Sequence, residues 1–159
     1  MLEKELRTKV RESREAGITE EQICSIIVES LNDAIAKQKE FDSANQDNSL
    51  TKLVSNILRE IGIPANLKGY NYLRESIIYC TNNTIDSITK ELYPFIARKF
   101  NITPDRVERG MRHAIEVGCE RADEEVMHEY FGNSYKKNKK KPTNSEFIFN
   151  IVDYIHNIH

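Results

Sequence analysis

The pattern of apolar positions predicts a chain built from helices. Between residues 93 and 118, apolar side chains recur at helical spacing in two runs that a short turn separates. The second run opens at Pro104, which suits the first position of a helix because its missing N–H would be unpaired there. Asn101 falls in the turn, where a left-handed backbone is often required and asparagine tolerates it. We therefore predict a helix-turn-helix, with Thr103 as the cap of its second helix.

The second of these helices has two chemically different faces. At about 100° per residue, one face gathers small and apolar residues: Val107, Met111, Ala114, Ile115 and Gly118. The other face gathers charged residues: Asp105, Arg109, Arg112, His113 and Glu116, with Arg106 and Glu108 at its flanks. A helix that enters the major groove needs this division, because arginine bonds guanine bidentately and glutamate accepts from cytosine. An ordinary surface helix would carry similar charges, but the preceding helix, turn and cap favour DNA binding.

Helical spacing extends toward the N-terminus. A thin apolar stripe predicts a short, polar helix over residues 2–15, and a strong one predicts a second helix over 20–40. Thr19 and Gln22 have the spacing of a capping box at the start of the second helix. Residues 41–49, FDSANQDNS, are polar and turn-rich, and they predict a linker with a domain boundary. We expect a helical arm plus polar linker over residues 1–49 and a helix-turn-helix DNA-binding domain over 50–159.

The rest of the chain also predicts helices. The apolar pattern resumes at Leu50 and stops at Gly62, and further helices are expected near 68–80, 121–131 and from a second capping box at Thr143 to Ile155. Pro94 predicts either a separate turn before it or a bend, since proline disrupts a helix interior. No alternating strand pattern of any length is present. The predicted fold class is all-α, a helical bundle built around the helix-turn-helix with an N-terminal helical arm.

The apolar stripe of helix 20–40 needs a surface to cover it. Two helices in about 40 residues rarely form a domain alone, so the stripe packs on the rest of the chain or on a second copy. Self-association is the favoured alternative. The last helix has an apolar face broad enough for both the core and a partner. We expect a homodimer through the N-terminal or the C-terminal helix.

Composition narrows the cellular setting. No apolar run among the 159 residues approaches the length that spans a bilayer, and the first ten residues lack the apolar region of a signal peptide. The cysteines, Cys24, Cys80 and Cys119, are far apart and odd in number, as expected of reduced thiols in a cytoplasmic protein. These features indicate a cytoplasmic protein without a membrane partner.

The charge distribution is more informative than the total. The net charge of -2 does not itself suggest nucleic acid. Residues 1–49 carry 7 Lys or Arg against 11 Asp or Glu, and residues 50–159 carry 16 against 14. The second region therefore has a net charge of +2, and it contains the lysine-rich run YKKNKKKP. Such local clustering matters more than the total for binding phosphates.

No other chemistry is favoured. His113, Cys119 and His128 lie close in sequence, but their spacing matches no common zinc pattern. There is no glycine-rich phosphate loop, nucleophile elbow or Ser/His/Asp order that would indicate catalysis. We expect neither a metal, a cofactor nor an enzymatic activity.

Four segments carry a specific family resemblance. They are EIGIPANLKGYNYLRESI at 60–77, SITKELYPFIARKFN at 87–101, RVERGMRHAIEV at 106–117 and KPTNSEFI at 141–148. With these segments in this order, residues 50–155 resemble the C-terminal effector domain of the stage zero sporulation transcription factor, the master response regulator of endospore formation. The resemblance implies an all-helical domain that binds a short operator box on double-stranded DNA, often as tandem copies. It also implies that the helix with the RVER motif enters the major groove, and it makes RNA polymerase a candidate partner.

The resemblance assigns roles to individual positions. The base-contacting residues would be Glu108, Arg109 and Arg112, where Glu108 either accepts from a cytosine or orients Arg112. The DNA backbone contacts would be Arg106, His113, Lys139, Lys140, Lys141, Thr143 and Asn144. The capped N-terminus of the last helix could receive a phosphate directly.

Three features depart from the family pattern. About 49 residues precede the effector region, too few for a phosphorylatable receiver, and their pattern is helical. Gly110 and Gly118 lie in the recognition helix where the family tends to have alanine, and they either permit close packing or soften the helix. The loop between Ile78 and Ser87 is slightly shorter. We therefore expect a receiver-less, sequence-specific regulator that phosphorylation does not switch. The alternative is an adaptor or antagonist that binds a related regulator through the N-terminal amphipathic helix.

Overall fold

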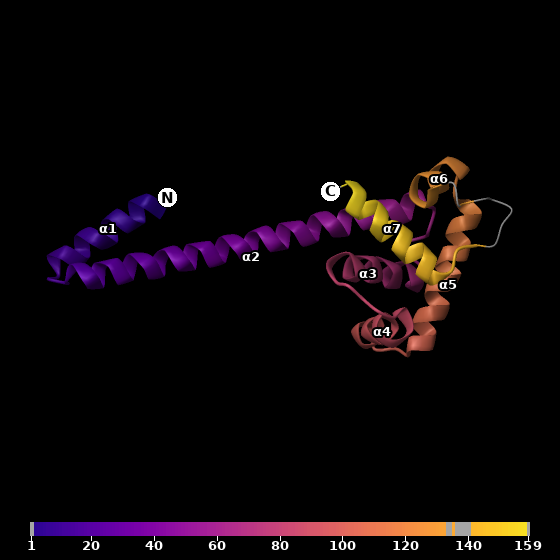
Figure 1. Ribbon diagram of the computed structural model, residues 1–159, viewed down its shortest axis with the longest axis horizontal. Helices are drawn as coiled ribbons and strands as arrows, with labels where there is room; N and C mark the ends of the chain where they lie inside the picture. Colours follow the sequence, from indigo (N-terminus) through magenta and orange to yellow (C-terminus); the bar gives the residue numbers. More distant parts are fainter. Residues whose placement is uncertain (1, 133–134, 136–140, 159) are drawn as a thin grey trace. The chain divides into compact units, whose positions relative to one another are not determined.

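Helices make up all the regular structure that can be described. The computed structural model describes residues 2–132, 135 and 141–158, and every regular element in these ranges is helical (Figure 1). The predicted all-α class is thus confirmed. Contacts between Cα atoms divide the chain into two compact units, Met1–Asn48 and Ser49–His159. In the described ranges, no helix combines the length and the apolar character needed to cross a membrane.

The N-terminal unit is a pair of helices with very little core. Helix α1 (Leu2–Glu15) lies beside the first turns of α2 (Glu20–Glu60), after a reversal at Gly17, whose φ is 73° (Figure 1). The predicted capping box is confirmed: the Gln22 N–H donates to Thr19 Oγ1 at 3.4 Å, and the Thr19 N–H donates to Gln22 Oε1 at 3.2 Å. Among the described residues of this unit, Ile23 is the only buried hydrophobic one. The helix pair therefore has little packing of its own to stabilise it.

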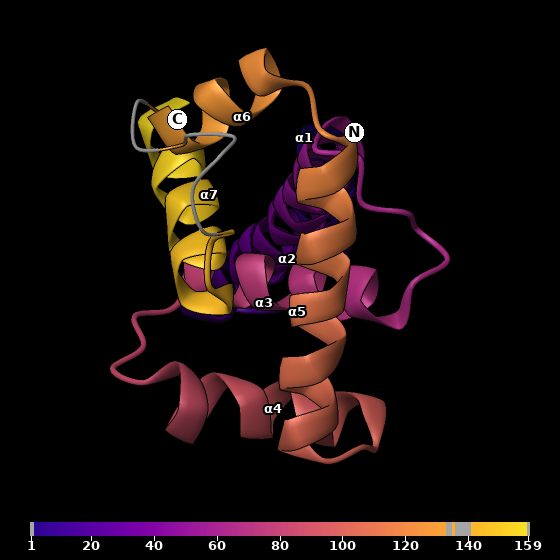
Figure 2. The same cartoon turned by 90° about the vertical axis from the view of Figure 1, so that its right-hand side faces the viewer.

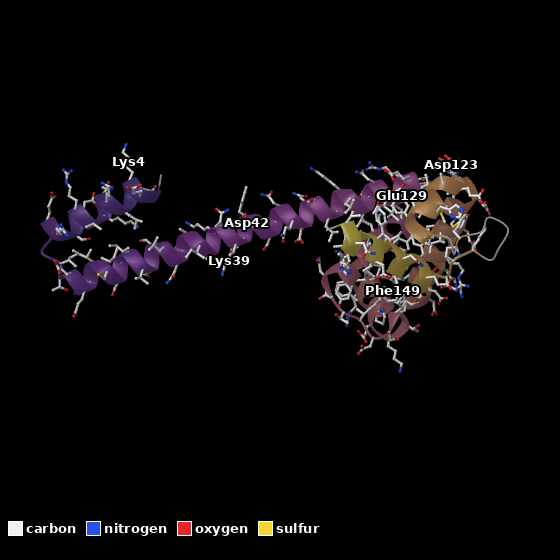
Figure 3. The ribbon with its side chains drawn as sticks, turned by 45° about the horizontal axis from the view of Figure 1, so that its top comes forward. Lys4, Lys39, Asp42, Asp123, Glu129 and Phe149 are labelled. Atoms are coloured by element: carbon white, nitrogen blue, oxygen red, sulfur yellow. The ribbon has the colours of Figure 1, made fainter. Side chains whose placement is uncertain are left out.

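The loop predicted over residues 41–49 is wrong, because α2 continues through it from Glu20 to Glu60. The segment contains neither glycine nor proline, and its Asp, Ser and Asn residues cost at most about 0.7 kcal/mol each relative to alanine in a helix. Lys39 and Asp42 project from this exposed stretch (Figure 3), and Gln38 Nε2 donates to Asp42 Oδ1 at 3.0 Å. Polar composition here marks a solvated helix rather than a break. The role of residues 1–49 as an arm stays a prediction.

The C-terminal unit contains a continuous hydrophobic core. The last turns of α2 bury Val54 and Leu58 and end at Gly62, whose φ of 87° makes it a fitting stop. Three helices, α3 (Lys68–Asn82), α5 (Pro104–Arg121) and α7 (Asn144–Ile158), pack against one another, and α6 (Glu124–Phe131) covers part of α7. Side chains from all of these helices meet in the core, with Leu73, Ile77, Met111, Met127 and Phe147 fully buried. This core supports the outer surface of α5.

Pro94 determines how the chain enters the helix-turn-helix. A π-helical turn, η1 (Ile88–Leu92), precedes α4 (Tyr93–Phe100), and Pro94 occupies the first turn of α4. The Ser87 hydroxyl accepts a hydrogen bond from the Lys90 N–H at 3.2 Å and so caps the wide turn. Of the two alternatives predicted at Pro94, the structure has the separate turn. A proline placed there loses no regular helix hydrogen bond, which explains why the two helical segments meet at this point.

Candidate nucleic-acid interface

Local sequence chemistry builds the turn between α4 and α5. Asn101 has φ 53° and ψ 51°, the predicted left-handed conformation, and the Ile102 N–H donates to the Ala97 carbonyl at 2.9 Å. Pro104 begins α5, as predicted. Thr103 occupies the N-cap position with an extended backbone, but its side chain makes no capping hydrogen bond. Figure 2 shows α4 lying across the N-terminal end of α5, as in a helix-turn-helix.

The two faces of α5 separate as the sequence predicts. The inward residues are all buried: Val107, Met111, Ala114, Ile115 and Gly118. Arg106, Arg109, Arg112 and His113 are exposed on the outward side. In the described part of the chain, no hydrogen bond or ion pair engages the side chains of Arg106, Arg109 or His113. This row of cationic and polar groups, which we call the α5 outer row (Arg106, Arg109, Arg112 and His113), is thus open to an anionic partner.

Glu108 and Arg112 form an ion pair one helical turn apart. Arg112 Nη2 donates to Glu108 Oε1 at 2.6 Å, while the Arg112 side chain remains 63% exposed. An exposed pair of this kind contributes little to stability, about 0.3–0.5 kcal/mol in a helix. It does, however, restrict the orientation of the guanidinium without withdrawing it from the surface. Of the two roles considered for Glu108, this geometry favours orienting Arg112.

Asn144 lies in a different environment from the one expected of a DNA backbone contact. Its side chain is buried, at 6% exposure, at the start of α7. Its Nδ2 donates to the Tyr93 hydroxyl at 3.0 Å and to the Glu108 carbonyl at 3.1 Å. Burial raises the pKa of Tyr93, although the Asn144 hydrogen bond acts in the opposite direction. The amide therefore joins three helices instead of facing solvent.

Thr143 and Glu146 form the second predicted capping box. The Glu146 N–H donates to Thr143 Oγ1 at 3.2 Å, and the Thr143 N–H donates to Glu146 Oε2 at 2.8 Å. The Thr143 hydroxyl also donates to Glu146 Oε2 at 3.0 Å. This reciprocal capping fixes the first turn of α7 beside α5. Thr143 itself is exposed and lies at the edge of the surface.

Lys141 is paired with an acidic residue of α5. Its Nζ donates to Glu120 Oε1 at 2.7 Å, and both side chains are well exposed. The side-chain hydrogen bond lowers the pKa of Glu120 and raises that of Lys141. The pair partly neutralises Lys141 in the free protein. Because it is exposed, it is screened by salt and competes weakly with a phosphate. Lys139 and Lys140, the other predicted contacts in this run, lie outside the described residues.

A groove lies between α5 and the start of α7. Its volume is about 330 Å³, and it is lined by Arg112, Glu116, Lys141, Pro142, Thr143 and Asn144. Two cationic side chains and a helix N-terminus therefore border one concave surface, with Glu116 as the opposing charge. Such a site favours an anion, because the first N–H groups of a helix carry partial positive charge.

Two residues of this region escaped the sequence prediction. Tyr93 had only a place in the apolar pattern of α4, and Glu120 had no assigned role. Tyr93 and Asn144 are 51 positions apart, so no local spacing could have connected them. The charge on Glu120 gave a weak signal, since an acidic residue on the last turns of α5 can reach a nearby lysine.

Metal ligation finds no support in the described residues. They contain no group of three or more His, Cys, Asp or Glu side chains placed to hold an ion. Cys119 is half-buried, and burial raises the pKa of its thiol. His128 instead contacts the Gly132 carbonyl through Nδ1 at 3.1 Å.

Comparison with known protein families gives an independent result. A family model described as "Sporulation initiation factor Spo0A C terminal" matches residues 54–155. The match covers more than half of the chain and includes α3 to α6 and nearly all of α7. It contains the four segments that carry the resemblance seen in the sequence, apart from none of their residues.

Proposed function

The chain belongs to the family of the sporulation initiation factor Spo0A C-terminal domain, and on this basis we propose that it regulates transcription by sequence-specific DNA binding. Membership makes the matched region a DNA-binding regulatory domain of the sporulation type rather than a catalytic one. The observation that carries the finer proposal is the α5 outer row, which is exposed above a fully buried underside. A helix held in this way can enter a major groove without losing its packing.

The base contacts are assigned to the middle of α5. Arg109 is exposed and its guanidinium has five donors that suit the O6 and N7 acceptors of guanine. Arg112 is also exposed, and its ion pair with Glu108 orients it before DNA arrives. Glu108 remains 40% exposed, which leaves its carboxylate within reach of a cytosine amino group. These three residues would supply the sequence discrimination.

The DNA backbone contacts are assigned to the flanks. Arg106 and His113 are exposed on the same helix, and Thr143 and Lys141 border the groove beside it. We propose that this groove receives a phosphate next to the base-contacting residues. Lys139 and Lys140 belong to the same basic run and would add sequence-independent attraction. Phosphate contacts of this kind position the protein, whereas base contacts specify the site.

The N-terminal unit is proposed to be a self-association arm. Val28, Leu31 and Ile35 share one face of α2, and all three are exposed, with Ile35 at 53%. In contrast, the exposed apolar residues of α7, Phe149 (Figure 3) and Ile158, are only two and stand apart. Pairing through α2 would bring two domains to neighbouring DNA boxes and raise affinity through effective concentration. Residues 2–48 contain helices only, so we propose that association, not receiver phosphorylation, is what they contribute.

The experiment that tests the function starts without a known operator. The whole chain is used to select duplexes from a random library at physiological salt, and the enriched duplex is then compared with a scrambled one by gel shift. We expect specific binding at least about 10³-fold tighter than binding to scrambled duplex. No enrichment, or equal binding to both duplexes, would contradict sequence-specific regulation. That result would favour the second candidate, an adaptor that uses the exposed α2 face to bind a related regulator. In the favoured case RNA polymerase is the expected downstream partner, and the protein acts in the cytoplasm.

A further inference from the structure

We infer that Asn144 is a positioning residue for DNA recognition, which sets the register between the base-contacting helix α5 and the phosphate-contacting start of α7. This inference rests on the proposed DNA-binding function and gives Asn144 a role other than contact with DNA. The first evidence is its hydrogen bonding. An amide nitrogen has two protons, and here one goes to the Glu108 carbonyl and one to the Tyr93 hydroxyl. Neither proton is left for a phosphate.

The place where Asn144 meets α5 is the part of the helix that matters for recognition. Glu108 lies one turn before Arg112, and its own side chain pairs with Arg112. A hydrogen bond to the Glu108 carbonyl therefore holds the turn from which the proposed base contacts project. Bidentate readout of a base depends on this placement, because hydrogen bonds weaken steeply away from their preferred distance and angle.

A second contact connects the same two segments further along α5. Lys141 pairs with Glu120, twelve residues after Glu108 and so about 18 Å along the helix axis. The segment from Lys141 to Asn144 is thus attached to α5 at two points, with the 330 Å³ groove beside it. The Lys141–Glu120 pair is exposed and weakens with salt or with a competing phosphate. The Asn144 bonds are buried and neutral, so they persist when DNA occupies the groove.

The two kinds of DNA contact should respond differently to the loss of Asn144. Lysine presents a point charge on a flexible stem and can follow a displaced phosphate. Planar, bidentate base contacts have no such tolerance. Without Asn144, the protein would keep its sequence-independent affinity and lose discrimination. A residue that only stabilised the fold, or only contacted a phosphate, would lower both affinities together.

The test compares Asn144→Ala with Asn150→Ala in the whole chain. Asn150 is a matched control, because its Nδ2 also donates to a backbone carbonyl, that of Glu146 at 2.6 Å, but within α7 itself. Affinities are measured for the duplex selected by the wild-type chain and for its scrambled version. We expect Asn144→Ala to lower the ratio of the two affinities about tenfold, as for loss of one good base contact. Binding to the scrambled duplex should change less than about twofold, and Asn150→Ala should leave both unchanged.

A second variant covers the case in which Asn144→Ala does not fold. Asn144→Asp keeps the size of the side chain, removes both donors and places a negative charge in the first turn of α7, where it is favourable. Its charge control is Asn150→Asp. A lower affinity ratio for Asn144→Asp than for Asn150→Asp supports the inference. An unchanged ratio in the folded variant, or equal losses on both duplexes, overturns it. A wild-type chain that enriches no sequence overturns the proposed function itself, and this inference with it.

Discussion

Gly69 of α3 and Gly110 of α5 meet so closely that neither helix has room for a side chain there. A Cβ atom on Gly69 would lie 1.9 Å from the Gly110 carbonyl oxygen, and a Cβ on Gly110 would lie 2.9 Å from the ring of Tyr72. Gly118 is similarly confined, since a Cβ there would lie 2.5 Å from Cγ1 of Ile63. Of the two explanations considered for Gly110 and Gly118, close packing is therefore the one that the structure favours.

The two glycines at this crossing should differ in their response to alanine. Gly69→Ala would push α3 from α5 because its obstacle is backbone, so we expect a loss of about 3 kcal/mol or more in the free energy of unfolding. Gly110→Ala meets only the edge of a side chain, and it gains about 0.5–1 kcal/mol of helix propensity. We expect its net loss to be below about 2 kcal/mol. Urea unfolding of both variants measures the difference, and a smaller loss for Gly69→Ala would contradict the close approach.

Arg109 should carry discrimination rather than general affinity. Its side chain is exposed in the middle of the α5 outer row, so Arg109→Ala should cost about 1–3 kcal/mol on the selected duplex and little on a scrambled one. Arg59→Ala is the control, because Arg59 is an exposed arginine on α2. Gel-shift titration of both duplexes gives the four affinities. Equal losses on the two duplexes would show that Arg109 contacts phosphate and not a base.

Much of the DNA-binding motif could be predicted because its signals are local. The left-handed Asn101, Pro104 at the start of α5 and the capping box of Thr143 and Glu146 each depend on neighbours within four residues. The spacing of apolar residues on α5 identified its buried face for the same reason. These features are set by backbone sterics and by unpaired helix-end groups, which the sequence displays directly.

The failures have two physical causes. Residues 41–49 were expected to form a loop because they are polar, yet polarity without glycine or proline does not stop a helix that is established on both sides. The burial of Asn144 could not be predicted, because it depends on Tyr93 and Glu108, which are 51 and 36 positions away. The approach of Gly69 to Gly110 is of the same kind. Contacts between distant segments require the fold before the residue's role can be recognised.

The Lys141–Glu120 pair should restrain DNA binding in the free protein. Glu120→Gln would remove the paired carboxylate, so we expect affinity for selected and scrambled duplexes to rise alike, by up to about fivefold. Lys141→Ala should weaken both alike and reduce the slope of log affinity against log salt by about one. Glu129→Gln changes the net charge equally on α6 and serves as the control. Unchanged affinity in Glu120→Gln would mean that Lys141 does not approach the duplex.

The three cysteines should differ in reactivity toward a thiol reagent. Cys24 is exposed, whereas burial raises the pKa of Cys80 from 9.0 to about 11 and also raises that of Cys119. The reactive species is the thiolate, so at pH 8 Cys24 should be labelled first and Cys80 only when the protein unfolds. Mass spectrometry of peptides after brief exposure to iodoacetamide gives the order. Early labelling of Cys80 would contradict its burial beneath α3.

The same shift predicts a dependence of stability on alkaline pH. Because the folded-state pKa of Cys80 lies above its unfolded value, the unfolded chain loses this proton first as the pH rises. The contribution is therefore present below pH 9 and is lost between about pH 9 and 11. Urea unfolding across this range should show the wild-type chain losing more stability than Cys80→Ala. Parallel curves for the two proteins would show that the thiol does not contribute.

The exposed face of α2 provides the test of self-association. Val28, Leu31 and Ile35 are apolar side chains in water, and covering them in a second copy would contribute about 25 cal/mol for each Å² removed from solvent. Leu31→Glu combined with Ile35→Glu keeps good helix formers at both positions but would bury charge in such an interface. We expect light scattering to give a dimer for the wild-type chain and a monomer for the double variant. The variant should also lose at least about tenfold in affinity for a duplex with two boxes, with little change on a single box, because only the two-box duplex benefits from linkage. Phe149→Glu, on the exposed side of α7, is the control, and a monomeric Phe149→Glu beside a dimeric double variant would move the interface to the C-terminal helix.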